Sequence, residues 1–457
     1  MKHICYFIII LFQLHFLSSQ SIPNYNLLKQ SNGIIFDAGL NWEELTNFKP
    51  IGYKKLIDKQ QIGEFSQNFI GQLGLSKSTD DFSLYGFSVF RYKKYFYAYS
   101  YPLYTNNIVN NYLDKNLRNL NIPQDDNSGI GFENSWANLQ IGRGKESWGA
   151  GNDIELALSE NSNPYQYFLL SSDYGKIRVR YIHGFLENID GNVNRYINAR
   201  GIEWTNHKSL IIGFSETIIY SGENRSIDIG YVNPMASHLE IELNDRLNVI
   251  GASNANAVWQ MHLDYLLNKR IRLSFNYLFD EYVIDEIQKE KGKEHGKAFS
   301  IRLACTPINL SKYIIAMHSS IIHVGTPTFR HGLGTNNFVQ NRKPLGWYRG
   351  SDGQEINVGL KFYNKKDIIA SINYGLIQSG EENIIYRSYE TYKDYIKGPF
   401  PSGKVNETIF TDASLIYWKK YLIYYTGLHW SKNIKGESKL EYTFGIRIYH
   451  TFSSKLF

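Results

Sequence analysis

The sequence lacks the features that mark a helical membrane protein or a disulfide-stabilised domain. Only two of its 457 residues are Cys, and the mean hydropathy is −0.36. After an apolar N-terminal run, no stretch approaches the ~18 uninterrupted apolar residues of a spanning helix. Cys5 lies in that run, so Cys305 is the single cysteine that follows it. The sequence therefore excludes helical membrane architecture, and we expect no intrachain disulfide.

Motifs for catalysis and metal binding are also missing. There is no Gly-x-Ser-x-Gly nucleophile elbow and no His-Glu-x-x-His zinc motif. Gly142 to Lys145 lacks the spacing of a phosphate-binding loop, and Asp125 to Gly129 lacks the glutamate that closes a calcium loop. His318 and His323 are five positions apart, so on one strand they face opposite sides. We therefore expect no enzyme activity, no catalytic residues, no cofactor and no metal.

What the chain does contain is aromatic residues and a regular alternation. It has 35 Tyr, 26 Phe and 8 Trp. From Ile271 to Asp280 the odd positions are apolar or aromatic and most even positions are polar, and Ile356 to Phe362 has the same period of two. In a membrane β-barrel only every second strand residue faces lipid, and Tyr and Trp form girdles at both interfaces. A barrel therefore explains why low hydropathy and many aromatics occur together.

The connections between the alternating segments fall into two lengths that broadly alternate along the chain. The short, mostly basic connections are Lys93-Lys94, Asn206 to Lys208, Asn268 to Arg270, Asn364 to Lys366 and Lys419-Lys420. The long, polar connections are Thr105 to Asn134, Ser221 to Ser253, Glu281 to Gly296, His323 to Asp352 and Gln378 to Glu407. Outer-membrane barrels have short periplasmic turns and long extracellular loops. The fold class predicted is therefore an all-β, transmembrane antiparallel β-barrel.

The number of strands follows from these connections. Seven hairpins with short turns are predicted at Phe82 to Tyr104, Tyr165 to Phe185, Tyr196 to Ile219, Ala255 to Asp280, Ala298 to Ile322, Gln354 to Ile377 and Ile409 to Trp430. Single strands are predicted at Phe65 to Leu75, Ser135 to Ile141, Asp153 to Ser159 and Leu440 to Phe452. The total is eighteen, with sixteen as the alternative. Such a barrel holds water unless loops or the N-terminus plug it.

The two ends of the chain show patterns expected of targeting signals. Lys2, the apolar run from Cys5 to Leu17 and the following Ser18-Ser19 predict a signal peptide at residues 1–19, because the run is shorter than the ~20 residues of an anchor helix. Residues 20–64 are predicted as an N-terminal periplasmic segment and residues 65–457 as the barrel. The aromatic C-terminal residue Phe457 is typical of strands that the barrel insertion machinery reads. We expect the protein in the outer membrane of a Gram-negative bacterium.

A cationic stripe marks one predicted strand. Lys176, Arg178 and Arg180 alternate with apolar or aromatic residues, which places three cations on its water face. Such a stripe attracts anionic solutes or acidic polysaccharide. The alternative is a set of lumen charges balanced by facing carboxylates such as Glu203, Glu216 or Asp264.

Four aromatic residues could stack on sugar rings. They are Trp148, Trp204, Trp347 and Tyr348, which lie in loops or near predicted rims. Residues of an interfacial girdle have the same appearance in sequence, so both roles stay open.

The segment from Gly142 to Pro164, GRGKESWGAGNDIELALSENSNP, resembles Wzi-type capsule assembly proteins. The matching pattern is Gly-Arg, then Trp-Gly-x-Gly, then Leu-x-Leu-Ser, then Asn and Pro. Further similar blocks follow in the same order at Ala199 to Trp204, Glu216 to Tyr220 and Tyr231 to Pro234. The resemblance covers about Tyr97 to Asp280. It departs from the family at Ala150, where Pro is usual, and in the N-terminal region, which shows no strongly helical pattern.

The resemblance implies an eighteen-stranded outer-membrane barrel that acts as a non-enzymatic lectin. It would hold capsular or exopolysaccharide and help to assemble or anchor it at the cell surface. Arg143, Trp148 and Asn161 are the predicted glycan-binding cluster, with Arg178 as a lumen contact. The alternative role of the cluster is to lock a buried turn that closes the lumen.

Two other functions stay open from the sequence. One is a diffusion porin for small, possibly anionic solutes, and the other is a structural partner in surface secretion or motility. Besides polysaccharide, the expected partners are outer-membrane lipid and lipopolysaccharide and the barrel insertion machinery. No nucleic acid is expected.

Overall fold

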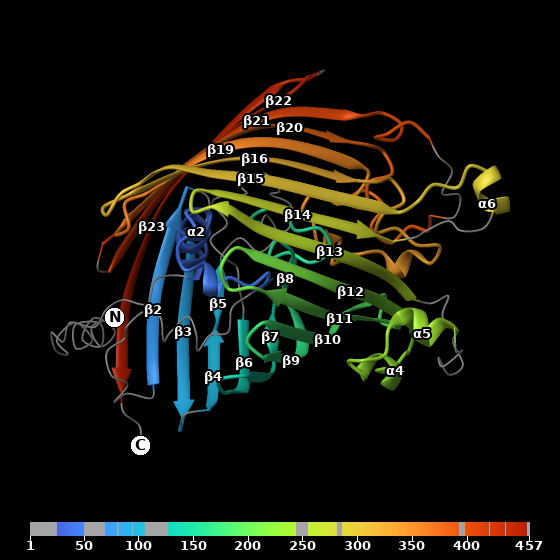
Figure 1. Ribbon diagram of the computed structural model, residues 1–457, viewed down its shortest axis with the longest axis horizontal. Helices are drawn as coiled ribbons and strands as arrows, with labels where there is room; N and C mark the ends of the chain where they lie inside the picture. The colour runs from blue at the N-terminus through green and yellow to red at the C-terminus, as the bar shows by residue number, and fades with distance from the viewer. Residues whose placement is uncertain are drawn as a thin grey trace, which may run out of the picture.

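A closed antiparallel β-barrel dominates the computed structural model, which describes residues 25–49, 69–79, 82–93, 95–105, 127–243, 255–280, 286–392, 398–419, 421–434 and 436–454 (Figure 1). The expected signal peptide and Phe457 lie outside these residues. The first barrel strand pairs with the last, from Phe69 opposite Ser454 to Ser78 opposite Gly445.

Every neighbouring pair of barrel strands is antiparallel. The strands are β2 (Phe69–Ser78), β3 (Phe82–Tyr92), β4 (Phe96–Tyr101), β5 (Leu103–Thr105), β6 (Asn127–Glu133), β7 (Ala137–Gly144), β9 (Tyr165–Asp173), β10 (Ile177–Ile189), β11 (Val193–Thr205), β12 (Leu210–Glu223), β13 (Ala255–Asn268), β14 (Ile271–Phe279), β15 (Lys297–Asn309), β16 (Ile314–Val324), β19 (Gly353–Tyr363), β20 (Ile368–Ser379), β21 (Asn406–Lys419), β22 (Leu422–Asn433) and β23 (Ser438–Ser454). Pro102 separates β4 from β5, which both pair with β3 and count as one strand. The described residues thus form the eighteen strands that the sequence predicted.

One predicted strand is wrong and one observed strand was missed, although the total is confirmed. Asp153 to Ser159 is no barrel strand, because this stretch folds into the lumen and is covered by protein on both sides. The missing strand is β6, which the sequence analysis placed inside a long loop. Its alternation is hidden by Gly129 and Gly131, where a Cβ atom would lie 2.8 Å from the Tyr99 hydroxyl and 2.5 Å from the Tyr97 hydroxyl.

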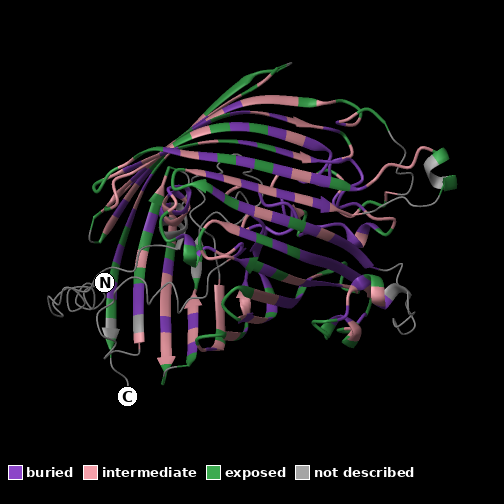
Figure 2. Ribbon diagram, in the orientation of Figure 1, coloured by how far each residue is buried: buried purple, intermediate pink, exposed green. Residues whose placement is uncertain are grey.

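The two faces of the barrel differ as the alternation predicts. In β14 the outward Ile271, Phe275 and Phe279 are partly exposed, whereas the inward Arg272 and Asn276 are buried. Bands of buried and exposed residues alternate along most strands in Figure 2. A closed barrel of this size with an apolar outer belt belongs in the outer membrane of a Gram-negative bacterium.

The N-terminal residues 25–49 lie inside this barrel. They form α2 (Tyr25–Asp37), η1 (Trp42–Glu44) and β1 (Phe48–Lys49), and Figure 1 shows α2 surrounded by strands. Ile34 and Ala38 pack on the inward residues Ile314, Ala316 and Ile369. The sequence showed no strong helical pattern here, because lumen packing rather than intrinsic propensity stabilises this helix. The boundaries predicted for residues 20–64 and 65–457 stay predictions.

The other short elements lie in the connections. They are β8 (Ser147–Trp148), α4 (Ile229–Val232), α5 (His238–Leu243), α6 (Glu286–Glu290), η4 (Gly334–Asn336), β17 (Val339–Gln340) and β18 (Lys343–Pro344). Among the described residues, no helix has the length and apolar character needed to cross a membrane.

Candidate functional site: the lumen plug and the loops above it

The connection between β7 and β9 turns into the lumen at Trp148-Gly149-Ala150-Gly151. Gly149 and Gly151 have φ values of +135° and +84°, which only glycine adopts without strain. A Cβ on Gly149 would lie 2.8 Å from Asn276 Oδ1, and one on Gly151 would lie 2.9 Å from the Ser274 Cβ. The two glycines therefore let this segment lie directly against the inner wall at β14.

Ala150 makes hydrogen bonds that a proline could not make in full. Its N–H donates to Asn276 Oδ1 at 2.8 Å, and its carbonyl accepts from Asn276 Nδ2 at 3.0 Å. Ala150 is fully buried. The departure from the usual Trp-Gly-Pro-Gly is thus matched by an asparagine on the wall that uses the additional donor.

Trp148 lies in the packed centre of the plug. Its side chain is only 1% exposed, and its ring lies 5.1 Å from the ring of Phe48, which pairs with it across the β1–β8 sheet. Its indole N–H donates to Glu146 at 2.8 Å, and Glu146 also accepts from Arg180 at 2.9 Å. Burial raises the pKa of Glu146 above its usual value, and the nearby Arg180 offsets only part of this increase. In this conformation Trp148 joins the plug to the N-terminal segment.

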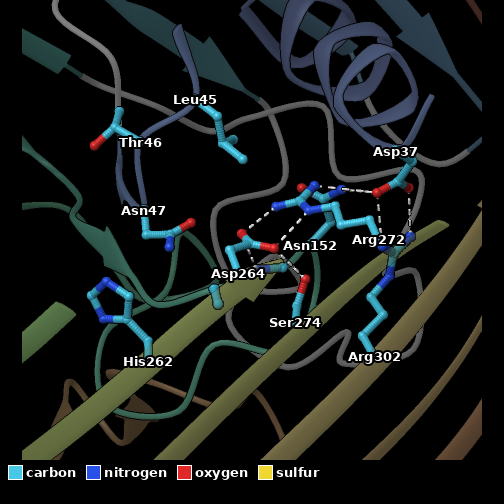
Figure 3. A network of polar contacts seen from close by, with 12 residues as sticks. Asp37, Leu45, Thr46, Asn47, Asn152, His262, Asp264, Arg272, Ser274 and Arg302 are labelled. Atoms are coloured by element: carbon cyan, nitrogen blue, oxygen red, sulfur yellow. Dashed lines mark hydrogen bonds and ion pairs between the residues drawn. The ribbon is translucent and has the colours of Figure 1, made fainter. Parts of the chain in front are cut away.

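Buried charges hold the N-terminal segment to the wall (Figure 3). Asp37 accepts from Arg302 at 2.9 and 2.8 Å and from Arg272 at 3.2 Å. Arg272 also donates to Asp264 at 2.8 and 2.6 Å, and Ser274 donates to the same carboxylate. Two carboxylates thus meet two guanidinium groups. Burial alone would raise the pKa of Asp37, but Arg302 and Arg272 outweigh it and lower that pKa to about 2.

Arg178 and Glu203 clamp the end of the same segment. Arg178 donates to the Leu45 carbonyl at 2.5 Å and to Glu203 at 3.1 Å. Glu203 also accepts from the Asn47 N–H at 2.8 Å. Of the three predicted stripe cations, Arg178 and Arg180 are thus paired with carboxylates inside the barrel, and Lys176 is exposed. Both arginines are therefore lumen charges balanced by carboxylates, which was the alternative stated for this stripe.

A third segment, the loop between β16 and β19, is joined to the plug through close backbone contacts. Trp347 N–H donates to the Leu156 carbonyl at 3.0 Å, and Ser159 N–H donates to the Leu345 carbonyl at 2.8 Å. A Cβ on Gly346 would lie 1.7 Å from the Leu156 carbonyl oxygen, so no other residue fits there. The N-terminal segment, residues 145–164 and residues 325–352 consequently form one packed unit, which we call the lumen plug.

The structure separates the predicted glycan-binding residues. Trp148 is enclosed in the plug, and Asn161 lies half-buried in it with its N–H on Ser159 Oγ at 3.2 Å. Arg143 shares the parity of the outward Leu139 and Ile141, so it leaves β7 on the outer face. Arg178 lies at the periplasmic end of the plug. Arg143, Trp148 and Asn161 therefore do not form one cluster, and contact of these residues and of Arg178 with glycan stays a prediction.

A group of aromatic and polar residues in two long loops contains one predicted aromatic candidate, Tyr348, and three residues that were not predicted. Arg349 lies over the Tyr348 ring, 4.5 Å from its centroid. Asn383 connects this pair to the next loop, because its side chain donates to the Arg349 carbonyl and its own carbonyl accepts from Tyr386 N–H. Tyr386 is 63% exposed. We call Tyr348, Arg349, Asn383 and Tyr386 the loop cluster; the aromatic candidate Tyr348 was its only signal in sequence.

The other aromatic candidates have different surroundings. Trp204 is 40% exposed on the outer face near the periplasmic rim, as in an interfacial girdle, and Trp347 is buried in the plug. Among the residues that the structure describes, no three His, Cys, Asp or Glu side chains are grouped to hold a metal ion.

Comparison with known proteins shows similarity in structure alone. No protein-family model and no curated protein sequence matches the chain. Wzi of Escherichia coli superposes with a TM-score of 0.65 at 11% identity, over 94% of this chain and 99% of Wzi. The chain has a Wzi-like fold. Wzi itself is described as an outer-membrane protein involved in Group 1 capsule assembly and as a carbohydrate-binding β-barrel.

Porins are more distant in structure than Wzi. OccD1 (OprD) matches over 84% of this chain and 95% of its own, with 12% identity and a TM-score of 0.45. OccK3 (OpdO) of Pseudomonas aeruginosa gives 84% and 94%, with 9% identity and the same TM-score. Values this low support no functional comparison.

Proposed function

We propose that this barrel binds capsular or exopolysaccharide at its extracellular loops and helps to assemble or anchor it at the cell surface, without catalysis. The observation that carries the proposal is the contrast between a lumen crossed by a tied plug and a loop cluster that combines a guanidinium group over the half-buried Tyr348 ring with the exposed Tyr386 of the next loop. The Wzi-like fold supports it.

The loop cluster has the chemistry that acidic glycans require. Sugar rings stack on aromatic faces through their C–H surfaces, and guanidinium groups bind uronic carboxylates in a bidentate manner. Tyr386 is exposed, and Arg349 is only half-buried, with a buried Nε that has no hydrogen-bond partner. Asn341 and Arg342 are exposed on the turn between β17 and β18 and add polar donors to the same loop.

Glycan retention by intact cells tests the proposal. Deleting the protein should move capsule from the cells into the medium, and the double variant Tyr386→Ala/Arg349→Ala should do the same with a normally folded barrel. Lys291→Ala is the matched control, because Lys291 is an exposed cation in another loop. An unchanged partition in the deletion strain would overturn the proposal.

Conductance in planar bilayers separates this function from a diffusion porin. Because Asp37, Arg272 and Arg302 fix the lumen plug, the purified barrel should conduct almost no ions at moderate voltage. Steady open-channel current with anion preference would instead support the porin. A structural role in secretion or motility would be indicated by stable co-purification with other envelope proteins.

A further inference from the structure

The connection after β12 folds back over the outside of the barrel. On β11 the residues Arg195, Ile197 and Ala199 are buried against the lumen plug. Tyr196, Asn198 and Arg200 alternate with them and therefore face outward. These three are nevertheless covered, since residues 225–243, including α4 and α5, lie on them; we call this segment the outer flap.

Hydrogen bonds from the wall hold the outer flap in place. Tyr181 Oη donates to the carbonyls of Tyr231 and Val232 at 3.0 and 2.9 Å, and Asn198 Nδ2 donates to the Tyr231 carbonyl at 2.8 Å. The N–H of His238 donates to Glu216 at 3.0 Å. The contacts come from three strands, so the flap has a defined position.

Aromatic rings fill the space between the flap and the wall. Tyr196 stacks on Tyr220 with ring centroids 5.0 Å apart, and Tyr220 stacks on Tyr231 of the flap at 4.7 Å. Tyr231 stacks in turn on His238 at 6.1 Å. Tyr220 and Tyr231 are completely buried, so the interface is packed like a protein core.

The flap covers an ion pair at a depth where the barrel meets lipid. Arg200 and Glu216 pair at 3.2 Å on the outer face. Arg200 lies five residues from Thr205, the periplasmic end of β11. At about 3.3 Å per residue and about 45° tilt, this is about 12 Å along the membrane normal, within an apolar band about 25 Å tall.

The far side of the flap is mostly apolar. Ile229 and Met235 are 84% and 85% exposed, and Ile227, Val232 and Leu239 are exposed as well. From residue 226 to residue 241, no exposed side chain carries a charge. This surface continues the lipid-facing belt of the same strands, in which Ile202, Ile212, Phe214 and Met261 are exposed. Figure 1 shows α4 and α5 beside the extracellular ends of β11 and β12.

We propose that the outer flap is a lipid-facing cover whose exposed apolar residues contact the acyl chains of the outer leaflet. Its inner side makes hydrogen bonds with polar side chains of the wall that would otherwise face hydrocarbon. Its outer side presents an apolar surface to the lipid in their place. Continuity with the lipid belt identifies acyl chains, rather than water or a polysaccharide, as the occupant of this surface.

Spin labels on the full chain, reconstituted in vesicles of phospholipid and lipopolysaccharide, test the proposal. In a Cys5→Ala/Cys305→Ala background, labels at Met235→Cys and, separately, Ile229→Cys should be more accessible to oxygen than to a water-soluble nickel chelate. Met261→Cys on the belt is the lipid control. Glu290→Cys, in the exposed loop helix α6, is the aqueous control.

Each outcome decides the proposal once heat-modifiable mobility on gels shows that the labelled barrel is folded. The lipid pattern at both sites supports it. The pattern of Glu290 at both sites overturns it in favour of a water-exposed flap. Protection from both reagents also overturns it and indicates that a second copy or another protein covers the flap. Because the labels do not touch the loop cluster, the result is independent of glycan binding.

Discussion

Buried charges occur on both faces of this barrel wall, but the two sets of charges are covered by different segments and would meet different solvents without them. Inside, Asp37 of the N-terminal segment completes a network with Arg272, Asp264 and Arg302. Outside, Arg200 and Glu216 pair beneath the outer flap. In each place a segment outside the barrel strands supplies the cover. If the cover is lost, however, the inner network can take up water, whereas the outer pair would face hydrocarbon.

Removing the flap should therefore have the largest effect. We expect that replacing residues 226–241 by a short Gly-Ser turn prevents stable insertion, because Arg200 alone would cost about 2–4 kcal/mol at mid-membrane depth. Loss of heat-modifiable mobility on gels measures this. The matched control replaces residues 286–295 in the exposed loop between β14 and β15. Equal insertion of the two variants would contradict the idea that the flap shields the outer ion pair from hydrocarbon.

Breaking the inner network should cost less. Asp37→Ala leaves Arg302 and Arg272 short of one carboxylate, and we expect a loss of about 3 kcal/mol in the free energy of unfolding. This lies at the lower end for buried pairs, because the lumen can admit water. Urea unfolding followed by tryptophan fluorescence measures it. Asp153→Ala, which removes the partly exposed partner of Lys361, should cost less than about 1 kcal/mol.

Acid should weaken the inner network in a defined pH range. The pKa of Asp37 is lowered from 3.8 to about 2, so its contribution is complete above pH 4 and is lost as the pH falls toward 2. The shift corresponds to about 2 kcal/mol. Unfolding free energies at pH 5 and pH 2 should differ less in Asp37→Ala than in the natural protein; an identical difference would show that other groups dominate.

The smallest effect is expected at the glycine turn. Ala150→Pro removes the N–H that donates to Asn276, and leaving that buried carboxamide oxygen unpaired should cost about 1–2 kcal/mol. In a double-mutant cycle with Asn276→Ala the two losses should not add. Full additivity would mean that this hydrogen bond does not stabilise the turn.

The strands and their connections could be predicted because both follow local rules. A period of two identifies a strand such as β14, and the lengths of the connections determine which rim each turn occupies. The number of strands, eighteen, was predicted correctly, although Asp153 to Ser159 was wrongly counted as a strand and β6 was missed. Alternating apolar residues in that stretch pack inside the plug, and glycines in β6 remove the side chains that would show a period.

The candidate site could be predicted less well, because its residues meet only after folding. Trp148 and its glycines were recognised, but their burial against Phe48 and Asn276 depends on segments far away in the chain. The loop cluster joins residues from two loops. Arg143 was expected beside Trp148, yet strand parity directs it outward.

The sequence by itself determined that the chain forms an outer-membrane barrel, because strand period and turn length are encoded in neighbouring residues. It could not determine which face of β11 meets lipid, since Asn198 and Arg200 alternate with Ile197 and Ala199 and would be assigned to the water side. Only the tertiary structure decided this. The plug covers one face of β11 and the outer flap covers the other. Burial on both faces therefore depends on segments outside the strand, about which the alternation within the strand carries no information.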